Sequence, residues 1–194
     1  TYLFYPFSSI YLFLRILTKK EHPKRYKEKL SKIDIKRGDG FLTWFHVASV
    51  GEAMSILPLV EDFDNNEKVK RILITTITLS SSQILQKKYA QNKKIIHQFL
   101  PLDIPIFVDK FLNYWSPNLA IFIDSEIWPN LITNIKKKNI PLLLVNARIT
   151  KKTFLRWKLF ENFAKQIFKK FHLSKLFFVI RPLISNKGIF FFLI

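Results

Sequence analysis

The chain has 194 residues, and its hydrophobic fraction of 48% excludes an intrinsically disordered polypeptide and is sufficient for one domain with a sizeable core. Thirty-two Lys and Arg against 14 Asp and Glu give a formal net charge of +18, so we expect an anionic partner: nucleic acid, a phosphorylated ligand or a membrane surface. Because the sequence contains no cysteine, a disulfide framework, a thiolate nucleophile and a Cys-ligated metal site are excluded.

The first segment, from Tyr2 to Leu17, is strongly apolar and aromatic, and a run of Lys and Arg follows it as far as Arg37. The segment is short for a membrane-spanning helix, which needs about 20 apolar residues. An apolar segment followed by basic residues is typical of a membrane anchor or an interfacial helix whose downstream part stays beside anionic lipid. The alternative is a first core helix with a solvated basic face. We expect residues 1–37 to form a membrane-associated apolar helix plus a basic segment.

From Phe41 onward, strand-like and helix-like segments alternate. The strand-like segments are β-branched and aromatic runs, at 41–47, 71–76, 95–100, 119–124 and 141–145. Helical spacing of apolar residues follows each of them, at 52–63, 81–89, 104–115, 129–138 and 151–170. Strand–helix–strand units with short connections predict an α/β fold with a Rossmann-like parallel sheet, here over residues 38–172.

In such a sheet, ligands bind beyond the carboxyl ends of the strands. Several polar clusters directly follow predicted strands, namely Ser49–Glu52, Thr75–Thr78, Asp103, Asp124–Glu126 and Asn146–Arg148. Since the carboxyl ends of parallel strands meet at one edge, these clusters are expected to converge there although they are far apart in the chain. This edge is the candidate site.

Glu52 lies where a small-residue turn, Ser49-Val50-Gly51, leads into a predicted helix. In a first helical turn, unpaired N–H groups and the positive end of the helix dipole favour a negative charge, and a carboxylate placed there can accept a proton. Position alone leaves two interpretations of Glu52, a helix cap and a catalytic base.

The threonines and Asp103 also have structural interpretations. Thr75, Thr76 and Thr78 suit strand ends and a helix cap as well as they suit a ligand. Asp103 lies in a proline-bounded turn, where it can do no more than cap the helix that follows it.

Asp124 and Glu126 are two carboxylates one residue apart at a predicted strand end, and they repel each other unless they are solvated, paired or used in binding. Arg148, at the next strand end, is a natural partner. A structural pair with Arg148 and a functional role are equally open from the residues alone.

The four histidines show no spacing typical of a metal-binding helix, so we predict no protein-held metal. Two of them, His46 and His97, lie in apolar strands and are expected to be hydrogen-bonded structural residues. No glycine-rich phosphate loop of a usual type is present in the sequence.

Taken in order, these clusters resemble the amino-terminal half of the 3-deoxy-D-manno-octulosonic acid (Kdo) transferases of bacterial lipopolysaccharide synthesis. The resemblance is carried by H-V-A-S-V-G-E (46–52), T-T-I-T (75–78), H-Q-F-L-P-L-D-I-P (97–105), D-S-E-I-W-P-N-L (124–131) and N-A-R-I-T (146–150). This sequence departs from the family pattern where Leu79 and Ser81 replace the usual Pro and Gly, and where Asp124 replaces a Glu. The resemblance covers roughly residues 2–172.

The resemblance implies one half of a two-domain GT-B-type glycosyltransferase, which transfers Kdo from CMP-Kdo to the lipid A precursor (lipid IVA) with inversion and without a metal or other cofactor. It implies that Glu52 is the general base, and that Asp124 and Glu126 stabilise charge developing at the transferred sugar. It places acceptor binding at the remaining residues of the same clusters, which are Ser49, Gly51, Thr75, Thr76, Thr78, Asp103, Asn146 and Arg148.

The resemblance also implies partners and a location. A lipid A precursor in an anionic membrane, met at the cytoplasmic face of the inner membrane, matches the apolar and basic start of the chain. CMP-Kdo would be bound by a second domain that has no counterpart in this sequence, and residues 173–194 are expected to be a divergent tail left by a truncation or a frameshift.

The competing function is a non-enzymatic basic domain that binds a membrane or RNA. Nucleic acid is the weaker expectation, because the aromatic residues fall mostly in predicted strand cores and no stacking motif of the RRM or OB kind accompanies the lysines.

Overall fold

The computed structural model describes residues 4–124, 127–146, 159, 162 and 165. In this part of the chain, five strands form one sheet in the order β3-β2-β1-β4-β5, and every neighbouring pair is parallel. The strands are β1 (Phe41–His46), β2 (Val69–Thr76), β3 (Ile95–Phe99), β4 (Leu119–Ile123) and β5 (Leu142–Val145). The predicted α/β fold with a Rossmann-like parallel sheet is confirmed.

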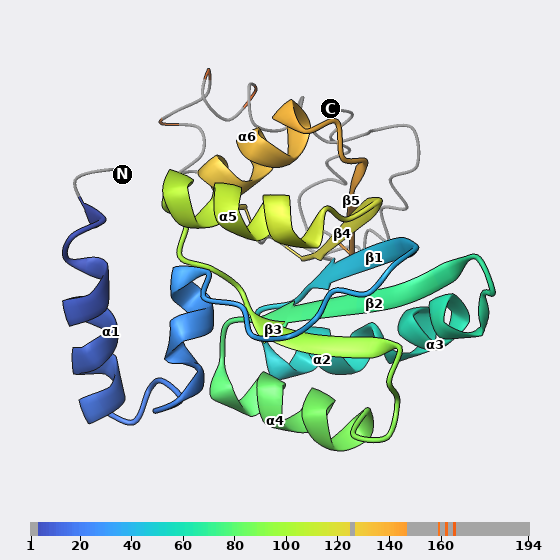
Figure 1. The fold of residues 1–194 in the computed structure, drawn as a ribbon, viewed down its shortest axis with the longest axis horizontal. Helices are drawn as coiled ribbons and strands as arrows, with labels where there is room; N and C mark the ends of the chain where they lie inside the picture. Colours follow the sequence, from blue (N-terminus) through green and yellow to red (C-terminus); the bar gives the residue numbers. More distant parts are fainter. Residues whose placement is uncertain (1–3, 125–126, 147–158, 160–161, 163–164, 166–194) are drawn as a thin grey trace, which may run out of the picture.

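Helices cover both faces of the sheet (Figure 1). On one face lie α2 (Val50–Ser55), α3 (Leu57–Asn65) and α4 (Leu79–Lys88), and on the other lie α5 (Pro105–Trp115) and α6 (Pro129–Lys137). Before the sheet come α1 (Ser8–Leu17) and the 3-10 helix η2 (Arg25–Leu30); η2 packs against β3 at the sheet edge, and α1 packs against η2.

Successive side chains of β1 enter two separate core layers. Leu42 and Trp44 point toward α5 and α6, where the Trp44 ring lies 5.1 Å from the rings of both Phe111 and Phe122. Phe45 points the opposite way, into the layer under α2, α3 and α4. A parallel strand buried on both faces needs a continuous apolar run, which explains why β1 contains little polar sequence.

Several predicted element boundaries differ from the structure by one or two residues, and two of the differences have a clear physical reason. The helix expected over residues 52–63 is two helices, α2 and α3, which meet at Ile56, and α3 carries Pro58 in its first turn. Proline has no N–H to donate to the preceding turn and is accommodated where a helix begins, so the chain starts a new helix there. The strand expected over 119–124 ends at Ile123, because Asp124 takes a left-handed conformation with φ 59°.

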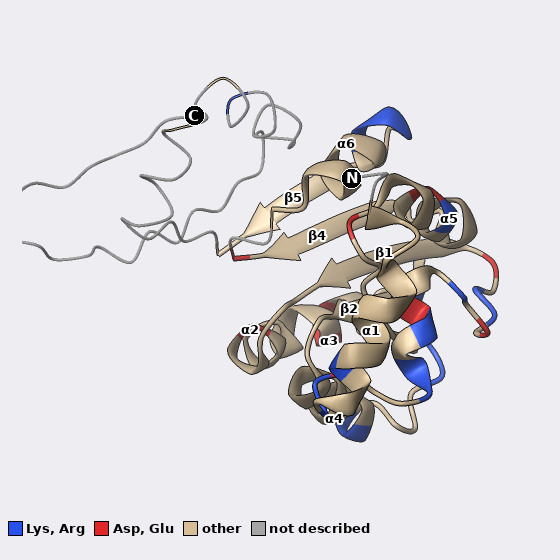
Figure 2. Ribbon diagram, turned by 90° about the vertical axis from the view of Figure 1, so that its left-hand side faces the viewer, with Lys and Arg blue, Asp and Glu red and all other residues tan. Residues whose placement is uncertain are grey.

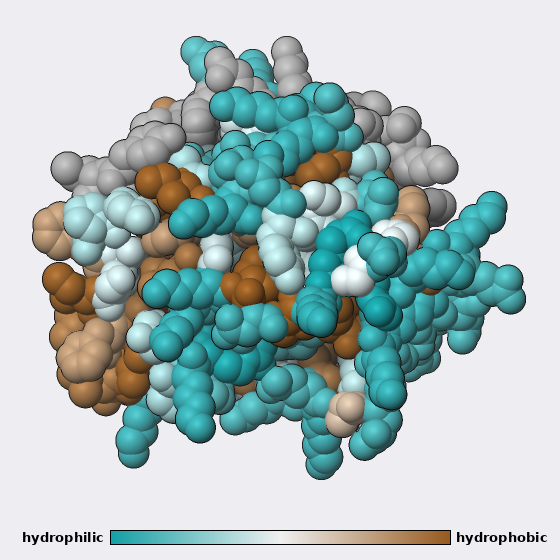
Figure 3. Space-filling model, in the orientation of Figure 1, coloured by the Kyte–Doolittle hydropathy of each residue, from teal (hydrophilic) through white to brown (hydrophobic). Residues whose placement is uncertain are grey.

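Helix α1 exposes a broad apolar face. Its buried residues are Ser8 and Leu12, whereas Ile10, Phe13 and Leu17 are each more than half exposed. The side of the molecule that carries α1 is accordingly strongly hydrophobic in Figure 3. Among the described residues, no helix is long and apolar enough to cross a membrane. The helix expected over 151–170 and the tail 173–194 fall outside the described residues, apart from the three isolated positions named above.

Candidate active site at the carboxyl edge of the sheet

The residues that follow the strands lie along one edge of the sheet, as predicted. In the strand register, His46 of β1 is opposite Thr75 of β2 and Phe122 of β4, and Ile123 of β4 is opposite Val145 of β5. The chain leaving β1 therefore enters α2 at the same edge as the turns after β2, β4 and β5. Figure 2 shows the arrowheads of β4 and β5 on the side where α2 lies.

Glu52 lies in the first turn of α2, with its carboxylate folded back on the turn. Oε2 accepts a hydrogen bond from the N–H of Ala48 at 2.8 Å, and Oε1 accepts one from the hydroxyl of Ser49 at 2.7 Å. Ser49, the N-cap residue, accepts in return from the N–H of Glu52 at 3.3 Å. This reciprocal arrangement is close to a capping box. These hydrogen bonds confirm the cap interpretation of Glu52. Because Glu52 is only half-buried, its side chain also remains accessible to solvent at this edge.

The turn after β2 is joined to the turn that holds Glu52. Thr78 is the N-cap of α4, and its hydroxyl accepts from the N–H of Ser81 at 3.3 Å and contacts the Ser81 hydroxyl. The carbonyl oxygen of Ala48 lies 3.4 Å from the hydroxyl of Thr78 and 3.3 Å from that of Ser81. The backbone of one residue, Ala48, thus links the Glu52 carboxylate to the loop of the neighbouring strand through its N–H and its carbonyl.

Thr75 and Thr76 are fully buried, and their hydroxyls contact other side chains of the domain. The Thr75 hydroxyl accepts from Nε1 of Trp44 at 2.9 Å and lies 3.0 Å from Nδ1 of His46. The Thr76 hydroxyl lies 2.9 Å from Nε2 of His97. Of the three threonines expected to bind a substrate, Thr78 is exposed, whereas Thr75 and Thr76 are buried in contacts within the domain. Substrate binding by these threonines stays a prediction.

Asp103 caps a helix, but the helix is α6 and not α5, which follows it in the chain. Its Oδ1 accepts from the N–H of Leu131 at 2.8 Å, and its Oδ2 accepts from the N–H of Asn130 at 3.1 Å. The side-chain amide of Asn130 donates to the carbonyl oxygen of Asp103 at 2.7 Å and to Oδ2 at 3.2 Å. Burial raises the pKa of Asp103, and the hydrogen bonds from Asn130 and Leu131 oppose that rise.

Asp124 and Asn146 occupy matching positions after β4 and β5. Both adopt the left-handed conformation, with φ of 59° and 53°, which Asp and Asn tolerate better than most residues. The N–H of Asp124 donates to the carbonyl of Val145 at 3.0 Å, so the two turns are joined at the edge. Glu126 and Arg148 lie outside the described residues, and their positions and the pairing with Arg148 stay predictions.

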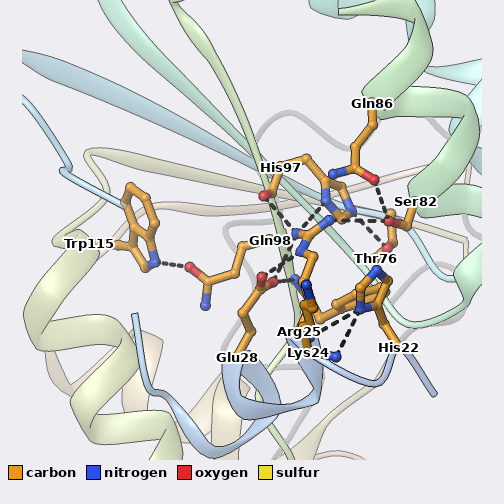
Figure 4. Close-up of polar contacts among 11 residues, drawn as sticks. His22, Lys24, Arg25, Glu28, Thr76, Ser82, Gln86, His97, Gln98 and Trp115 are labelled. Carbon is orange, nitrogen blue, oxygen red and sulfur yellow. Dashed lines mark hydrogen bonds and ion pairs between the residues drawn. The ribbon is translucent and has the colours of Figure 1, made fainter. Parts of the chain in front are cut away.

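His97 is a half-buried, hydrogen-bonded structural histidine at the β3 edge (Figure 4), and the structural role is as predicted. Its Nδ1 accepts from Nη2 of Arg25 at 2.9 Å. Arg25 also forms a bidentate ion pair with Glu28, in which Nε lies 2.6 Å from Oε1 and Nη2 lies 2.9 Å from Oε2. Burial, together with the charge of Arg25, lowers the pKa of His97 to about 3. His97 is therefore neutral at physiological pH. In the described ranges, no group of His, Asp or Glu could hold a metal ion.

Sequence reasoning missed the contact between the basic segment and this edge. Lys29 is buried, and its Nζ donates to Oε1 of Glu21 at 2.7 Å and to the carbonyl of Ile77, in the turn after β2, at 3.1 Å. The same Glu21 oxygen accepts from Nε of Arg15 on α1 at 2.7 Å. Burial lowers the pKa of Lys29, and Glu21 opposes that effect. The acidic residues within the basic run, Glu21 among them, were the available signal.

Known proteins match most of this chain. The family model described as 3-deoxy-D-manno-octulosonic-acid transferase (kdotransferase) matches residues 20–176. A 3-deoxy-D-manno-octulosonic acid transferase of Rickettsia bellii is 42% identical over 171 residues, which are 88% of this chain and 40% of that protein. A probable mitochondrial 3-deoxy-D-manno-octulosonic acid transferase of Arabidopsis thaliana is 35% identical over 191 residues, 97% of this chain and 41% of that protein. The transferase of Haemophilus influenzae is 33% identical over 114 residues, 59% and 26% of the two chains. The chain thus spans about two fifths of the first two relatives.

Proposed function

Because this chain belongs to the 3-deoxy-D-manno-octulosonic acid (Kdo) transferase family, we propose that it forms the acceptor-binding half of a glycosyltransferase that moves Kdo from CMP-Kdo to a lipid A precursor. The observation that carries the proposal is the position of Glu52. Its carboxylate is half-buried at the carboxyl edge of the sheet and is oriented by the N–H of Ala48 and the hydroxyl of Ser49.

In the proposed reaction, Glu52 is the general base. An acceptor hydroxyl of the lipid attacks the anomeric carbon of Kdo from the face opposite the leaving group, and its proton passes to the Glu52 carboxylate. The bond between that carbon and the phosphate oxygen breaks, and CMP leaves with the electron pair, so the configuration is inverted. A placed base of this kind typically contributes about 10²–10⁴-fold to the rate.

Asp124 and Glu126 are proposed to stabilise the positive charge that develops on the sugar, as carboxylates do in glycoside hydrolysis. The position of Asp124 next to the turn after β5 supports this role. CMP-Kdo would be held by a second domain. The relatives are long enough to contain one, because this chain matches only 40% and 41% of their length. No metal or other cofactor is part of the proposal.

Acceptor binding is proposed for the exposed members of the same edge. Ser49 and Thr78 are exposed, and Asn146 is half-buried. At Gly51, a side-chain carbon would meet no atom within 4 Å, so the surface there is open to a ligand. Arg148 is included by the family pattern alone. We propose an indirect role for three residues of the same clusters, which support this surface through hydrogen bonds within the domain: Thr75, Thr76 and Asp103.

The chain is proposed to meet its acceptor at the cytoplasmic face of the inner membrane. The exposed apolar face of α1 and its N-cap residue supports this, since Phe7, Phe13 and Leu17 are between 58% and 64% exposed. Lys24 and Lys27 of the following segment are also exposed and can face anionic head groups.

The test joins this chain to the carboxyl-terminal part of the Rickettsia bellii relative, which supplies the length that the chain does not match. The chimera is incubated with CMP-Kdo and a tetraacyl lipid A precursor, and the product is detected by mass spectrometry. Glu52→Gln should reduce transfer at least about 100-fold, while precursor binding changes little. Glu61→Gln, which alters a 55% exposed carboxylate on α3, is the matched control. Equal activity of the two variants would overturn the base role.

The net charge of +18 also suits an RNA-binding domain. Salt-sensitive, sequence-indifferent binding of RNA by the isolated chain, with no binding of the lipid A precursor, would favour that function over the transferase.

A further inference from the structure

Two motifs far apart in the sequence are held together by the contacts between Asp103 and the first turn of α6. The Asp103 carboxylate accepts from the N–H groups of both Asn130 and Leu131, at 3.1 and 2.8 Å. The Asn130 amide closes the contact by donating to the Asp103 carbonyl at 2.7 Å. The loop after β3 and the start of α6 are thereby joined on the face that carries α5 and α6.

The residue types fit this contact closely. Two neighbouring N–H groups at a helix start need two acceptor atoms, and a carboxylate supplies both from one side chain. Pro129, which precedes them, has no N–H of its own to satisfy. The raised pKa of Asp103 reflects the burial of this carboxylate, which is tolerated because these hydrogen bonds replace water.

The start of α6 continues the segment that begins at Asp124. At its beginning, the N–H of Asp124 donates to Val145 at 3.0 Å and the chain turns through a left-handed residue. At its end, Asn130 and Leu131 are bound to Asp103. Glu126 lies in sequence between these two attachments.

We propose that Asp103 is a positioning residue, which holds the start of α6 and thereby keeps Asp124, which precedes α6 in the chain, in place at the edge of the sheet. The inference rests on the proposed function, since that function assigns Asp124 and Glu126 to charge stabilisation. Asp103 itself does not touch the substrate. A displacement of about 1 Å in groups that act on the transition state can cost about 10²-fold in rate. Loss of the attachment should therefore lower kcat more than it raises KM.

The experiment is a double-mutant cycle in the chimera, with Asp103→Ala, Asn130→Ala and the pair, assayed at 25 °C with CMP-Kdo and the tetraacyl precursor. Each single change should lower kcat about 10-fold and should change the KM for CMP-Kdo and the KM for the precursor by less than about threefold. The double variant should lose no more activity than the weaker of the two single variants. Asp109→Ala is the matched control, because it removes a contact at the opposite end of α6, the ion pair between Asp109 of α5 and Lys138, the C-cap residue of α6, at 3.0 Å. It should leave kcat within about twofold of the parent.

An unchanged kcat in Asp103→Ala, with a lowered melting temperature, would show a cap with no positioning role and would overturn the inference. Additive losses in the cycle would overturn it too. If Asp103→Ala does not fold, Asp103→Asn carries the test, because its amide keeps one acceptor oxygen for the two N–H groups of Asn130 and Leu131. A full kcat in that variant counts against the inference. Full activity in Glu52→Gln would instead defeat the proposed function. An inactive Glu52→Gln beside a fully active Asp103→Ala defeats this inference alone.

Discussion

The N–H of Ala48 donates to Oε2 of Glu52 at 2.8 Å, while the carbonyl of the same Ala48 lies 3.3 Å from the buried hydroxyl of Ser81. The candidate base is therefore not held by its own helix alone. Its position depends on the loop that follows the neighbouring strand β2.

Removal of the Ser81 hydroxyl should loosen the turn that holds Glu52. We expect Ser81→Ala to lower kcat of the chimera about threefold to tenfold and to destabilise the domain by about 1 kcal/mol, the usual net value of a hydrogen bond. Steady-state kinetics and urea unfolding measure the two effects. Ser80→Ala changes an exposed serine in the same helical turn and should alter neither. Identical behaviour of the two variants would contradict the support attributed to Ser81.

The buried pair of Lys29 and Glu21 should respond unequally to single and double substitution. Lys29→Met leaves the Glu21 carboxylate 3% exposed with Arg15 as its remaining cation, and we expect a loss of about 3–5 kcal/mol of unfolding free energy. Glu21→Gln combined with Lys29→Met should recover part of this loss, because no buried carboxylate then lacks its buried ammonium partner. Urea unfolding at pH 7 tests both. Lys24→Met, at an exposed position of the same segment, should stay within about 0.5 kcal/mol of the parent.

Stability should fall on acidification through His97. Its pKa is lowered to about 3 in the folded chain, against an ordinary value of 6.5, so the unfolded chain binds this proton more readily. The stabilising contribution is complete above pH 6.5 and is lost as the pH falls toward about 3, at up to about 1.4 kcal/mol per pH unit.

His97→Gln removes this titration. Between pH 6.5 and pH 5, the unfolding free energy of the parent should decrease by about 1.5 kcal/mol more than that of the variant, as measured by urea unfolding. The comparison uses the slope of the unfolding free energy against pH and not its absolute value, because the substitution also alters the contacts with Arg25 and Thr76. Parallel pH dependences would show that His97 is not buried in the neutral form.

The exposed face of α1 should drive binding to lipid. Phe13→Ser combined with Leu17→Ser removes two large side chains that are 58% and 64% exposed, so the fold should lose little stability. Partitioning to vesicles of phosphatidylethanolamine and phosphatidylglycerol should weaken at least about tenfold, since burial of such a side chain contributes about 1.5–3 kcal/mol. Vesicle sedimentation measures it. Phe41→Ser, at a 40% exposed position at the start of β1, should bind as the parent does.

Much of the fold could be predicted from local sequence patterns. The apolar run at β1 and the alternation of strands with amphipathic helices indicated a parallel sheet buried on both faces, because burial on two sides requires continuous apolar residues. Parallel strands also bring their carboxyl ends to one edge, so the convergence of the turns at Glu52, Thr78, Asp124 and Asn146 followed from the order of the elements. The break between α2 and α3 could also have been predicted, because Pro58 favours the start of a new helix.

The partners of the polar side chains were decided by the tertiary structure alone. The sequence placed Asp103 before α5, yet its carboxylate binds the start of α6; it placed Lys29 in a basic run, yet Lys29 is buried against Glu21 and the turn after β2. It also left open whether Thr75 and Thr76 face a ligand or the interior. A local sequence pattern indicates how much of a segment is buried and which conformation the segment prefers. The identity of a hydrogen-bond partner depends instead on which distant segments packing brings within about 3 Å of each other.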